Sequence, residues 1–459
     1  MSRILEFVKT LENKPILIYG LGKSGLATAS ALSKAGVNVV IGDDNPENLE
    51  KLANLKHYNH DDELTQYAYL VLSPGIPFTH PEPHDIVKKA QKAEIEILCD
   101  IELFHKIYPD IKTVGVTGTN GKSTTSTLIT HILQECDYKT ALAGNIGTAI
   151  FDLENAQKLD WLVLEISSFQ IDLCPTFRPD ISVLLNLTPD HIDRHGTMEQ
   201  YAAVKERLTE PAQKSSYNKV VICSDDEFTK KITASTEDRT IIEVSTLNTL
   251  EQGTSIKENC LYENGQKIGD CSECETLAGI HNAQNTACAY AVAREIGCEA
   301  ETIWSALKNF AGLNHRQFVI RTINGVAYVN DSKSTNAAAA AVALTCRNNV
   351  YWIVGGRKKK NGLDGLEAFF PNIKHAFLIG ESTDDFALWF DQYGIEYSKA
   401  FTLEKALRDS HAMAQNNRGQ PGGAGVVLLS PACASFDQFK SFEHRGDVFT
   451  ELVEALEEV

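Results

Sequence analysis

An apolar strand, a glycine-rich loop and a helix follow one another directly at residues 111–133, and this run constrains the fold most strongly. The loop reads GTNGKST. Gly121, Lys122 and Ser123 fit the second half of the P-loop pattern G-x-x-x-x-G-K-[ST], but Val116 stands where its first glycine belongs. Backbone N–H groups of such a turn converge on phosphate oxygens, and Lys122 adds positive charge. The run predicts an α/β domain that binds a nucleotide triphosphate.

The rest of the chain also alternates apolar strands with helices. At 459 residues it is long enough for about three domains. Continuous apolar runs predict strands covered on both faces, as in a parallel sheet. The main expected strands lie at residues 15–20, 37–44, 69–77, 139–144, 161–167, 180–188, 219–224, 326–331, 350–356, 375–380 and 425–432. The more polar stretch at 233–276 predicts a small β-rich elaboration, and residues 279–297 predict a helix.

We therefore expect an α/β protein of three consecutive domains. Residues 1–104 would form a Rossmann-like domain, residues 105–312 a P-loop-type ATPase domain with a parallel sheet, and residues 313–459 a second Rossmann-like domain.

Charge and composition restrict the partners. The formal net charge is −18, with 61 acidic against 43 basic residues. This balance repels nucleic acid and anionic membranes, so we expect neither as a partner. The eleven cysteines are scattered, which favours reduced thiols over a disulfide scaffold. No signal peptide and no membrane-spanning stretch is evident, so we expect a cytoplasmic protein.

A second glycine motif lies near the N-terminus. Gly20, Gly22 and Gly25 follow a strand and open a helix, and Asp43 ends the next strand. This arrangement is typical of dinucleotide binding, because the glycines let the backbone approach a diphosphate at a helix N-terminus. The motif alone does not separate NAD from another diphosphate ligand.

Several polar residues follow apolar strands. Glu165 ends such a strand, and a carboxylate there is costly unless it meets a cation. Beside a phosphate loop, we expect that cation to be Mg²⁺. The segment LTPDHIDRHG holds Asp190, His191, Asp193 and His195. It could ligate zinc, lie on the rim of a phosphate site, or form a polar loop with Asp193 paired to Arg194; residue types alone do not decide.

Two further positions depend on context. Taken alone, Lys205 in YAAVKERL is expected to be a solvated surface lysine. Asp331 and Lys333 in VNDSKSTN follow a strand end, where α/β sheets bind ligands. Asp331 could orient a ribose or a positive group, and Lys333 a phosphate.

Taken together and in this order, the motifs resemble those of the Mur ligases, which build the peptide of bacterial cell-wall precursors. The motifs are GTNGKST, GNIG, DHIDRH, HNAQN, NHR and DSKSTN, and the resemblance covers nearly the whole chain. The shortened loop G-T-N-G-K-[ST] is typical of this family and of the folylpolyglutamate synthases. EISSFQ and SPACASFDQF are similar to the branch that adds D-glutamate to UDP-N-acetylmuramoyl-L-alanine.

The resemblance implies an ATP-dependent amide ligase of cytoplasmic peptidoglycan synthesis, and so a role in cell-wall biogenesis, cell shape and division. ATP would phosphorylate the substrate carboxylate, and the amine of D-glutamate would attack the acyl phosphate. ATP, Mg²⁺ at two sites and small-molecule substrates are implied, and we expect a monomer.

The resemblance also assigns roles to residues. Those implied to bind ATP are Gly118, Thr119, Asn120, Gly121, Lys122, Ser123, Thr124, Asn282, Asn285, Arg316 and Asp331. Implied metal ligands are Ser123, Glu165, His191 and Lys205, the last as a carbamate; implied catalytic residues are Lys122, His191, Lys205 and Lys333. Implied contacts to the UDP substrate are Gly22, Lys23, Ser24, Asp43, Ser73, Gly75, Asn145, Ser167 and Gln170. Those around D-glutamate are Lys333, Thr335, Lys359, Ser435 and Phe442.

The chain departs from the family pattern at two places. After Gly356 the family has a short turn leading to one lysine that meets D-glutamate; the longer RKKKNGLD here leaves Lys359 and Lys360 as alternatives. The segment DDNP lacks the arginine often found after Asp43.

Three alternative functions remain open at this point. A folylpolyglutamate-type ligase shares the shortened loop. An NAD-dependent oxidoreductase would use Gly20 to Asp43 but leaves the Lys122 loop unexplained. A non-catalytic nucleotide sensor would bind ATP without consuming it.

Overall fold

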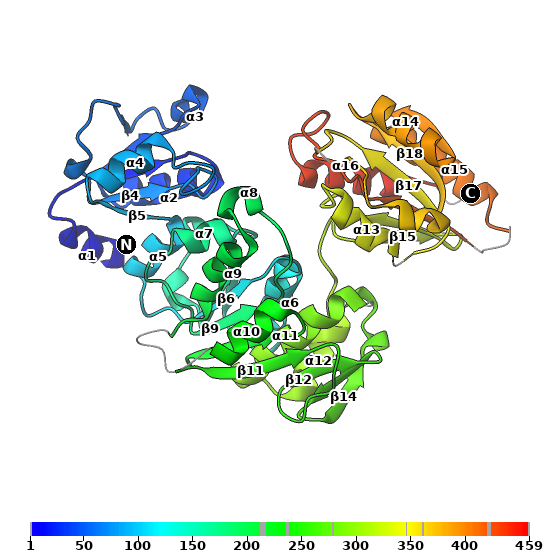
Figure 1. Ribbon diagram of the computed structural model, residues 1–459, viewed down its shortest axis with the longest axis horizontal. Coiled ribbons are helices and arrows are strands. Elements are labelled where there is room, and N and C mark those ends of the chain that lie inside the picture. The colour runs from blue at the N-terminus through cyan, green and yellow to red at the C-terminus, as the bar shows by residue number, and fades with distance from the viewer. Residues whose placement is uncertain are drawn as a thin grey trace. The chain divides into compact units, whose positions relative to one another are not determined.

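The computed structural model describes residues 2–211, 217–235, 238–277, 280–345, 347–359, 362–419 and 424–457. The chain divides into two compact units, Met1–Phe310 and Ala311–Val459 (Figure 1). The first unit contains two sheets and the second contains one. The predicted α/β class with three largely parallel sheets is confirmed.

The first sheet is parallel, with strand order β3-β2-β1-β4-β5. Its strands are β1 (Ile16–Tyr19), β2 (Val39–Gly42), β3 (Lys56–His57), β4 (Tyr69–Leu72) and β5 (Glu96–Leu98). Its helices are α1 (Ser2–Thr10), α2 (Lys23–Lys34), α3 (Pro46–Glu50), α4 (Asp85–Lys92) and α5 (Asp100–Ile107). The strand order reverses between β1 and β4, and in parallel sheets this is where a ligand crevice opens beyond the carboxyl ends.

The second sheet has the order β14-β13-β12-β11-β10-β9-β6-β8-β7 and is parallel from β7 to β12. Its strands are β6 (Thr113–Thr117), β7 (Thr140–Gly144), β8 (Trp161–Glu165), β9 (Ile181–Leu184), β10 (Lys219–Cys223), β11 (Thr240–Ser245), β12 (Thr254–Lys257), β13 (Cys260–Glu263) and β14 (Gln266–Asp270). Its helices are α6 (Lys122–Glu135), α7 (Ser168–Asp172), α8 (Ile192–His195), α9 (Met198–Glu206), α10 (Glu227–Ser235), α11 (Ile280–Ile296) and α12 (Ala300–Asn309). The β-rich elaboration expected at 233–276 is confirmed, because β11 to β14 lie there.

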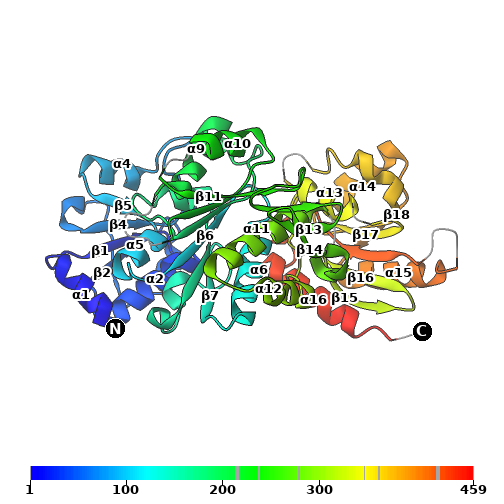
Figure 2. The ribbon, with the colours of Figure 1, turned by 90° about the horizontal axis from the view of Figure 1, so that it is seen from below.

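Helices cover both faces of the second sheet, as Figure 2 shows. On β10, Val221 and Cys223 pack with α6, α11 and α12, whereas Val220 and Ile222 pack with α9 and α10. Alternate residues of a strand point to opposite faces, so a continuous apolar run fills both cores. This packing confirms the expectation of strands covered on both faces.

The two sheets of the first unit share one apolar core. The cluster runs from Leu17 and Leu70 in the first sheet, through Phe104 of α5, to Leu164 in the second sheet and to Phe177, which precedes β9. Because α5 contributes to this shared core and spans Asp100–Ile107, the predicted boundary between residues 104 and 105 falls inside a helix. That boundary stays a prediction.

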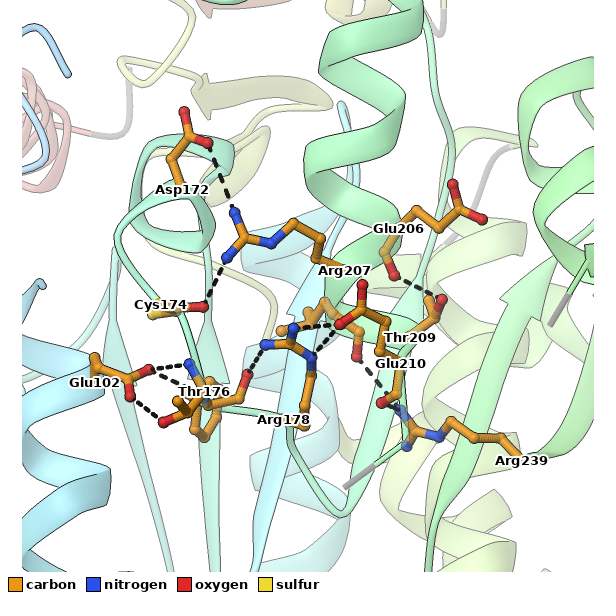
Figure 3. A network of polar contacts seen from close by, with 12 residues as sticks. Glu102, Asp172, Cys174, Thr176, Arg178, Glu206, Arg207, Thr209, Glu210 and Arg239 are labelled. Carbon is orange, nitrogen blue, oxygen red and sulfur yellow. Dashed lines mark hydrogen bonds and ion pairs between the residues drawn. The ribbon is translucent and has the colours of Figure 1, made fainter. Parts of the chain in front are cut away.

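Polar contacts reinforce the same junction (Figure 3). The buried carboxylate of Glu102 on α5 accepts hydrogen bonds from the hydroxyl and N–H of Thr176. Arg207, just beyond α9, donates to the carbonyl of Cys174 at 3.0 Å. Arg178 pairs with Glu210. The segment after α7 is thereby fixed between α5 and the end of α9.

The second unit has one sheet of order β15-β16-β20-β17-β18-β19, parallel except for the edge pair of β15 and β16. Its strands are β15 (Phe318–Ile323), β16 (Val326–Asn330), β17 (Val350–Gly355), β18 (Ile373–Ile379), β19 (Tyr397–Phe401) and β20 (Val426–Leu429). Its helices are α13 (Ala337–Thr345), α14 (Thr383–Tyr393), α15 (Leu403–Asn416) and α16 (Phe442–Glu454). The apolar-run pattern missed β15 and β19, because these partly exposed edge strands carry polar side chains.

Across the described ranges, every helix is too short or too polar to cross a membrane.

Candidate active site

The glycine loop connects β6 to α6. Gly121 has φ +85° and caps α6, and a β-carbon at this position would lie 2.1 Å from Oδ1 of Asn285. Both the backbone conformation and the space therefore require glycine. The Lys122 ammonium donates to the carbonyls of Gly118 (2.9 Å) and Thr119 (2.7 Å), so it lies over the loop. Ser123 and Thr124 occupy the first, buried turn of α6.

Asn186, two residues beyond the end of the neighbouring strand β9, holds this loop. Its carbonyl accepts the N–H of Thr119 at 2.8 Å, and its side-chain oxygen accepts the N–H of Asn120 at 2.8 Å. We did not predict Asn186 as a site residue. It ends the apolar run of β9 as Glu165 ends that of β8, and the same reasoning would have identified it.

Lys205 on α9 is almost fully buried, with 1% of its surface exposed. The residue-only prediction of a solvated surface lysine is therefore wrong. Its ammonium donates to Oγ1 of Thr117 (3.1 Å) and to the carbonyl of Gly118 (3.0 Å). Burial, and then repulsion from Lys122, lower the pKa of Lys205 well below its usual value. The charged form of this amine is thus destabilised directly beneath the phosphate loop.

Tyr201 lies one helical turn before Lys205. The Lys205 nitrogen is 4.9 Å from the centre of the Tyr201 ring, and the Tyr201 hydroxyl is 3.1 Å from Oγ1 of Thr119. Sequence reasoning missed Tyr201. The i, i+4 spacing places both residues on one face of a helix and was the available signal.

Glu165 ends β8 with 2% of its surface exposed. Its Oε1 accepts the side-chain N–H of Asn145 at 2.8 Å, while Oε2 is buried and has no hydrogen-bond partner among the described residues. A buried carboxylate oxygen without a partner is costly, and a hard cation such as Mg²⁺ would satisfy it. The residues present therefore fit Mg²⁺.

The two histidines of the His191 loop, His191 and His195, lie in different environments. His191 begins α8 in a left-handed conformation (φ 52°) and is half exposed, with its ring 4.9 Å from that of Phe169. His195 is buried against Oγ of Ser168 at 2.9 Å, and burial, aided by Arg194, lowers its pKa to about 4. Within the described residues, no three His, Cys, Asp or Glu side chains converge as a metal site, so the zinc interpretation gains no support.

A cavity of about 510 Å³ in the first unit brings together residues far apart in the sequence. The predicted residues that line it are Lys23, Ser24, Ser73, Gly75, Lys122, Asn145, Ser167, Gln170, His191 and Lys205. Pro74, from the SPGI loop (residues 73–76) expected to contact UDP, also lines the cavity, and the lining residues that we did not predict are Gly144, Ser168, Phe169 and Tyr201. The cavity thus joins the carboxyl end of the first sheet to the phosphate loop of the second.

Asp43 organises the N-terminal glycine turn. Its carboxylate accepts the N–H groups of Leu21 (2.5 Å) and Asn45 (2.8 Å) and the side chain of Asn48. Burial opposes its ionisation, but these hydrogen bonds hold its pKa below the usual value. Gly22 caps α2 nearby. Neither residue is among those lining the cavity.

The predicted adenine-nucleotide residues fall in both units. In the first, Asn285 on α11 accepts from Oγ1 of Thr125 at 3.1 Å and donates to Asn282 at 3.2 Å, next to the phosphate loop. In the second, Asp331 is buried and accepts from Ser430 at 2.7 Å; burial raises its pKa to about 7, against the charge of Arg316.

The predicted D-glutamate residues belong to the second unit. The Lys333 ammonium is 5.8 Å from the ring centre of Phe442. Ser435 is buried, Thr335 is partly buried and Lys359 is exposed. Lys360, the alternative to Lys359, lies outside the described residues.

Arg445 ties this region together and was missed. It is buried, and its guanidinium donates to the hydroxyl and carbonyl of Ser332 (both 2.9 Å) and to the carbonyl of Cys433 (3.1 Å). It therefore connects the loops after β16 and β20. An arginine within an amphipathic helix gives no sequence signal for such a role.

Comparisons with known proteins agree with this architecture. The Mur ligase middle domain matches residues 116–293, and the N-terminal domain of MurD-like Mur ligases matches residues 14–99. The UDP-N-acetylmuramate–alanine ligase of Thermotoga maritima superposes with a TM-score of 0.59 at 16% identity, covering 96% of this chain and 99% of that one. The two domain matches together place the chain among the Mur ligases.

Relatives with higher sequence identity show which family within the Mur ligases this chain belongs to. UDP-N-acetylmuramoylalanine–D-glutamate ligases of Nitrobacter winogradskyi and Paramagnetospirillum magneticum are 42% identical to this chain, with 98% of each chain covered. The one from Rhizobium meliloti is 43% identical, again over 98% of both chains. The chain belongs to this family, the UDP-N-acetylmuramoylalanine–D-glutamate ligases.

Proposed function

We propose that this chain uses ATP to join D-glutamate to UDP-N-acetylmuramoyl-L-alanine, a step of peptidoglycan precursor synthesis. The cavity carries the proposal, because its lining combines Lys122 and Lys205 with Ser73 and Gly75. One space thus offers the Lys122 cation for a nucleotide triphosphate beside polar groups for a nucleotide sugar. The names of the relatives at 42–43% identity support this choice of substrates.

The reaction must bring two anions together. The substrate carboxylate attacks the γ-phosphorus, the bond to the bridging oxygen breaks, and ADP and an acyl phosphate form. The amine of D-glutamate then attacks the acyl carbon, phosphate leaves, and the nitrogen loses a proton. Lys122 and the N–H groups of the loop stabilise the transferring phosphoryl charge, and positioning within the cavity supplies much of the remaining rate enhancement.

We propose two Mg²⁺ sites, one at Ser123 with Glu165 and one at His191 with Lys205. Mg²⁺ would offset the repulsion between the γ-phosphate and the carboxylate. Glu165 offers the buried oxygen without a partner described above. The neutral amine of Lys205 can attack CO₂ and lose a proton, and the resulting carbamate is an anionic oxygen ligand.

The remaining roles follow the family pattern. The nucleotide sugar would be bound by cavity residues, with Gly22 and Asp43 shaping the turn nearby. These cavity residues are Lys23, Ser24, Ser73, Gly75, Asn145, Ser167 and Gln170. Asn282, Asn285, Arg316 and Asp331 would contact the adenine nucleotide. Lys333, Thr335, Lys359, Ser435 and Phe442 would surround D-glutamate.

An amino-acid panel tests the proposal. Phosphate release is measured with ATP, Mg²⁺, UDP-N-acetylmuramoyl-L-alanine and one amino acid at a time. We expect turnover with D-glutamate and little with L-glutamate or lysine. Equal turnover with either would contradict the choice of D-glutamate, and turnover of folate in place of the nucleotide sugar would favour the folylpolyglutamate-type alternative. ATP binding without consumption would favour a sensor.

We also propose that the enzyme acts in the cytoplasm as a monomer. Its acidic net charge of −18 is consistent with a solution enzyme of small, charged substrates. Light scattering at working concentrations tests the monomer, and a mass of twice 50.6 kDa would contradict it.

A further inference from the structure

Arg194 is a buried cation that the proposed reaction does not use. It lies on α8, three residues after His191, and only 7% of its surface is exposed. Its guanidinium donates to the carbonyl of Ile76 at 2.8 Å and, over a longer distance of 3.4 Å, to that of His80. The ion pair with Asp193 that a simple polar loop would have required is not found between these described residues. Arg194 instead reaches from the second sheet to the loop after β4.

The loop that Arg194 holds is part of the cavity. Ser73 and Gly75, immediately before Ile76, line the end proposed for the nucleotide sugar. The His191 loop and the loop 73–80 also approach each other closely at Gly196. A β-carbon at Gly196 would lie 3.0 Å from Nε2 of His80. The His191 loop and the loop 73–80 therefore pack as one layer.

The other side of the guanidinium faces Phe169. The guanidinium carbon is 5.2 Å from the Phe169 ring centre, and the same ring is 4.9 Å from the ring of His191. A continuous series of contacts thus runs from Ile76 through Arg194 and Phe169 to His191. Packed groups of this kind move together, because an interior has little free volume.

The energetics favour a fixed guanidinium. Burial lowers the pKa of Arg194, whereas the carboxylates of Asp172 and Asp193 raise it. A buried guanidinium is retained only where acceptors replace its water, and the carbonyls of Ile76 and His80 do so here. Loss of the guanidinium would remove the donor from both carbonyls at once.

We propose that Arg194 is a positioning residue that couples the nucleotide-sugar loop at 73–80 to the His191 loop. Occupation of the nucleotide end of the cavity then fixes the side chain of His191. The inference rests on the proposed function, because it takes the nucleotide sugar to bind at Ser73 and Gly75. It adds a link between substrate binding and catalytic geometry.

Arg194→Lys tests the link, because lysine keeps the charge but loses the planar fork that donates to two carbonyls while stacking on a ring. We expect the KM for the nucleotide sugar to rise by about tenfold, as for the loss of one charged hydrogen bond, and kcat to fall. The KM for ATP should stay within about twofold, because within the described part of the chain the guanidinium of Arg194 has no hydrogen bond to the phosphate loop. A nucleotide-sugar KM within about twofold of wild type, or an equal rise in both KM values, would overturn the proposal.

Arg178→Lys is the matched control. Arg178 also donates to a backbone carbonyl, that of Phe177, and pairs with a carboxylate, that of Glu210, but it does not line the cavity (Figure 3). We expect this variant to keep both KM values.

Hydrogen exchange with UDP as the probe separates coupling from simple destabilisation and needs no turnover. In the wild type, UDP should slow amide exchange both at 73–80 and at 191–196. In Arg194→Lys it should slow exchange at 73–80 alone. Equal protection of 191–196 in both proteins, or wild-type protection confined to 73–80, would overturn the coupling. Failure of the amino-acid panel with normal UDP protection would contradict only the proposed reaction.

Discussion

At the scale of single residues, the buried ammonium of Lys205 has the most consequences for chemistry. Moving an ammonium out of water costs several kcal/mol, and nearby Lys122 adds repulsion. The hydroxyl of Thr117, the carbonyl of Gly118 and the ring of Tyr201 take the place of the lost water. A carbamate would reverse the sign of the charge and convert an unfavourable pair of cations into a favourable cation–anion pair.

Lys205→Ala should remove most of the activity. The loss should at least equal the ~10–100-fold effect of losing a residue that supports a metal ligand. Bicarbonate, formate or acetate should restore part of the activity by supplying an anionic oxygen in the vacated space. Initial rates of phosphate release check both effects, with the exposed Lys230→Ala as the control. A Lys205→Ala enzyme with half or more of the wild-type rate would disprove the metal-ligand role.

At the scale of elements, the strand–loop–helix unit of β6 and α6 depends on backbone geometry. Gly121 needs both a left-handed φ and the absence of a side chain, because Asn285 of α11 occupies the space. The phosphate loop is therefore shaped jointly by local sterics and by a helix more than 150 residues later in the chain.

Gly121→Ala should lower ATP affinity and stability together. The strained backbone costs about 1–3 kcal/mol, and the clash with Asn285 must displace either the loop or the asparagine. Isothermal titration with ATP and equilibrium denaturation measure the two effects. Gly36→Ala is a matched control, since Gly36 has φ +84° but open space around its would-be β-carbon. It should destabilise the protein and leave ATP affinity unchanged; equal ATP affinity in both variants would contradict the steric argument.

At the scale of the whole molecule, the chain forms two units with separate cores. Predicted ligand residues occur in both, with Asn282 and Asn285 in the first and Arg316 and Asp331 in the second. The first unit is cohesive because one apolar cluster passes through α5. The second contains its own two-faced core, with Trp352 on one face and Tyr351 on the other.

Asp331→Asn should change how stability depends on pH. Burial raises the native pKa of Asp331 from 3.8 to about 7, so between these values the native state retains a proton that the unfolded state releases. Its contribution to stability is therefore complete below about pH 4 and is lost as the pH rises through 7. The full shift corresponds to roughly 4 kcal/mol at most.

Equilibrium denaturation of the full chain at pH 5 and pH 8 measures this effect. We expect the wild type to lose stability relative to Asp331→Asn between these values. The buried His195, with its pKa lowered to about 4, acts in the opposite sense by losing stability as the pH falls, but it is present in both proteins and cancels. Parallel pH profiles for the two proteins would contradict the prediction.

The sequence predicted some features of the site more easily than others. The phosphate loop and its flanking strand and helix were visible because glycine spacing and apolar runs are local properties. The burial of Lys205 was not visible in the sequence, because α9 lacks a strong amphipathic pattern. The residues that cover Lys205 come from β6 and the loop that follows it. Arg194 and Arg445 gave no signal, since most of their hydrogen-bond acceptors are backbone carbonyls, which every residue type provides.

Local sterics and periodicity were enough to determine the α/β class, the glycine turns and the strands that carry the site, because each depends on a few neighbouring residues. Only the tertiary structure decided the strand order, the shared core at α5 and the cavity that joins Ser73 to Lys205. These features depend on contacts between segments about a hundred residues apart, where the choice of partner is made by burial, shape and charge.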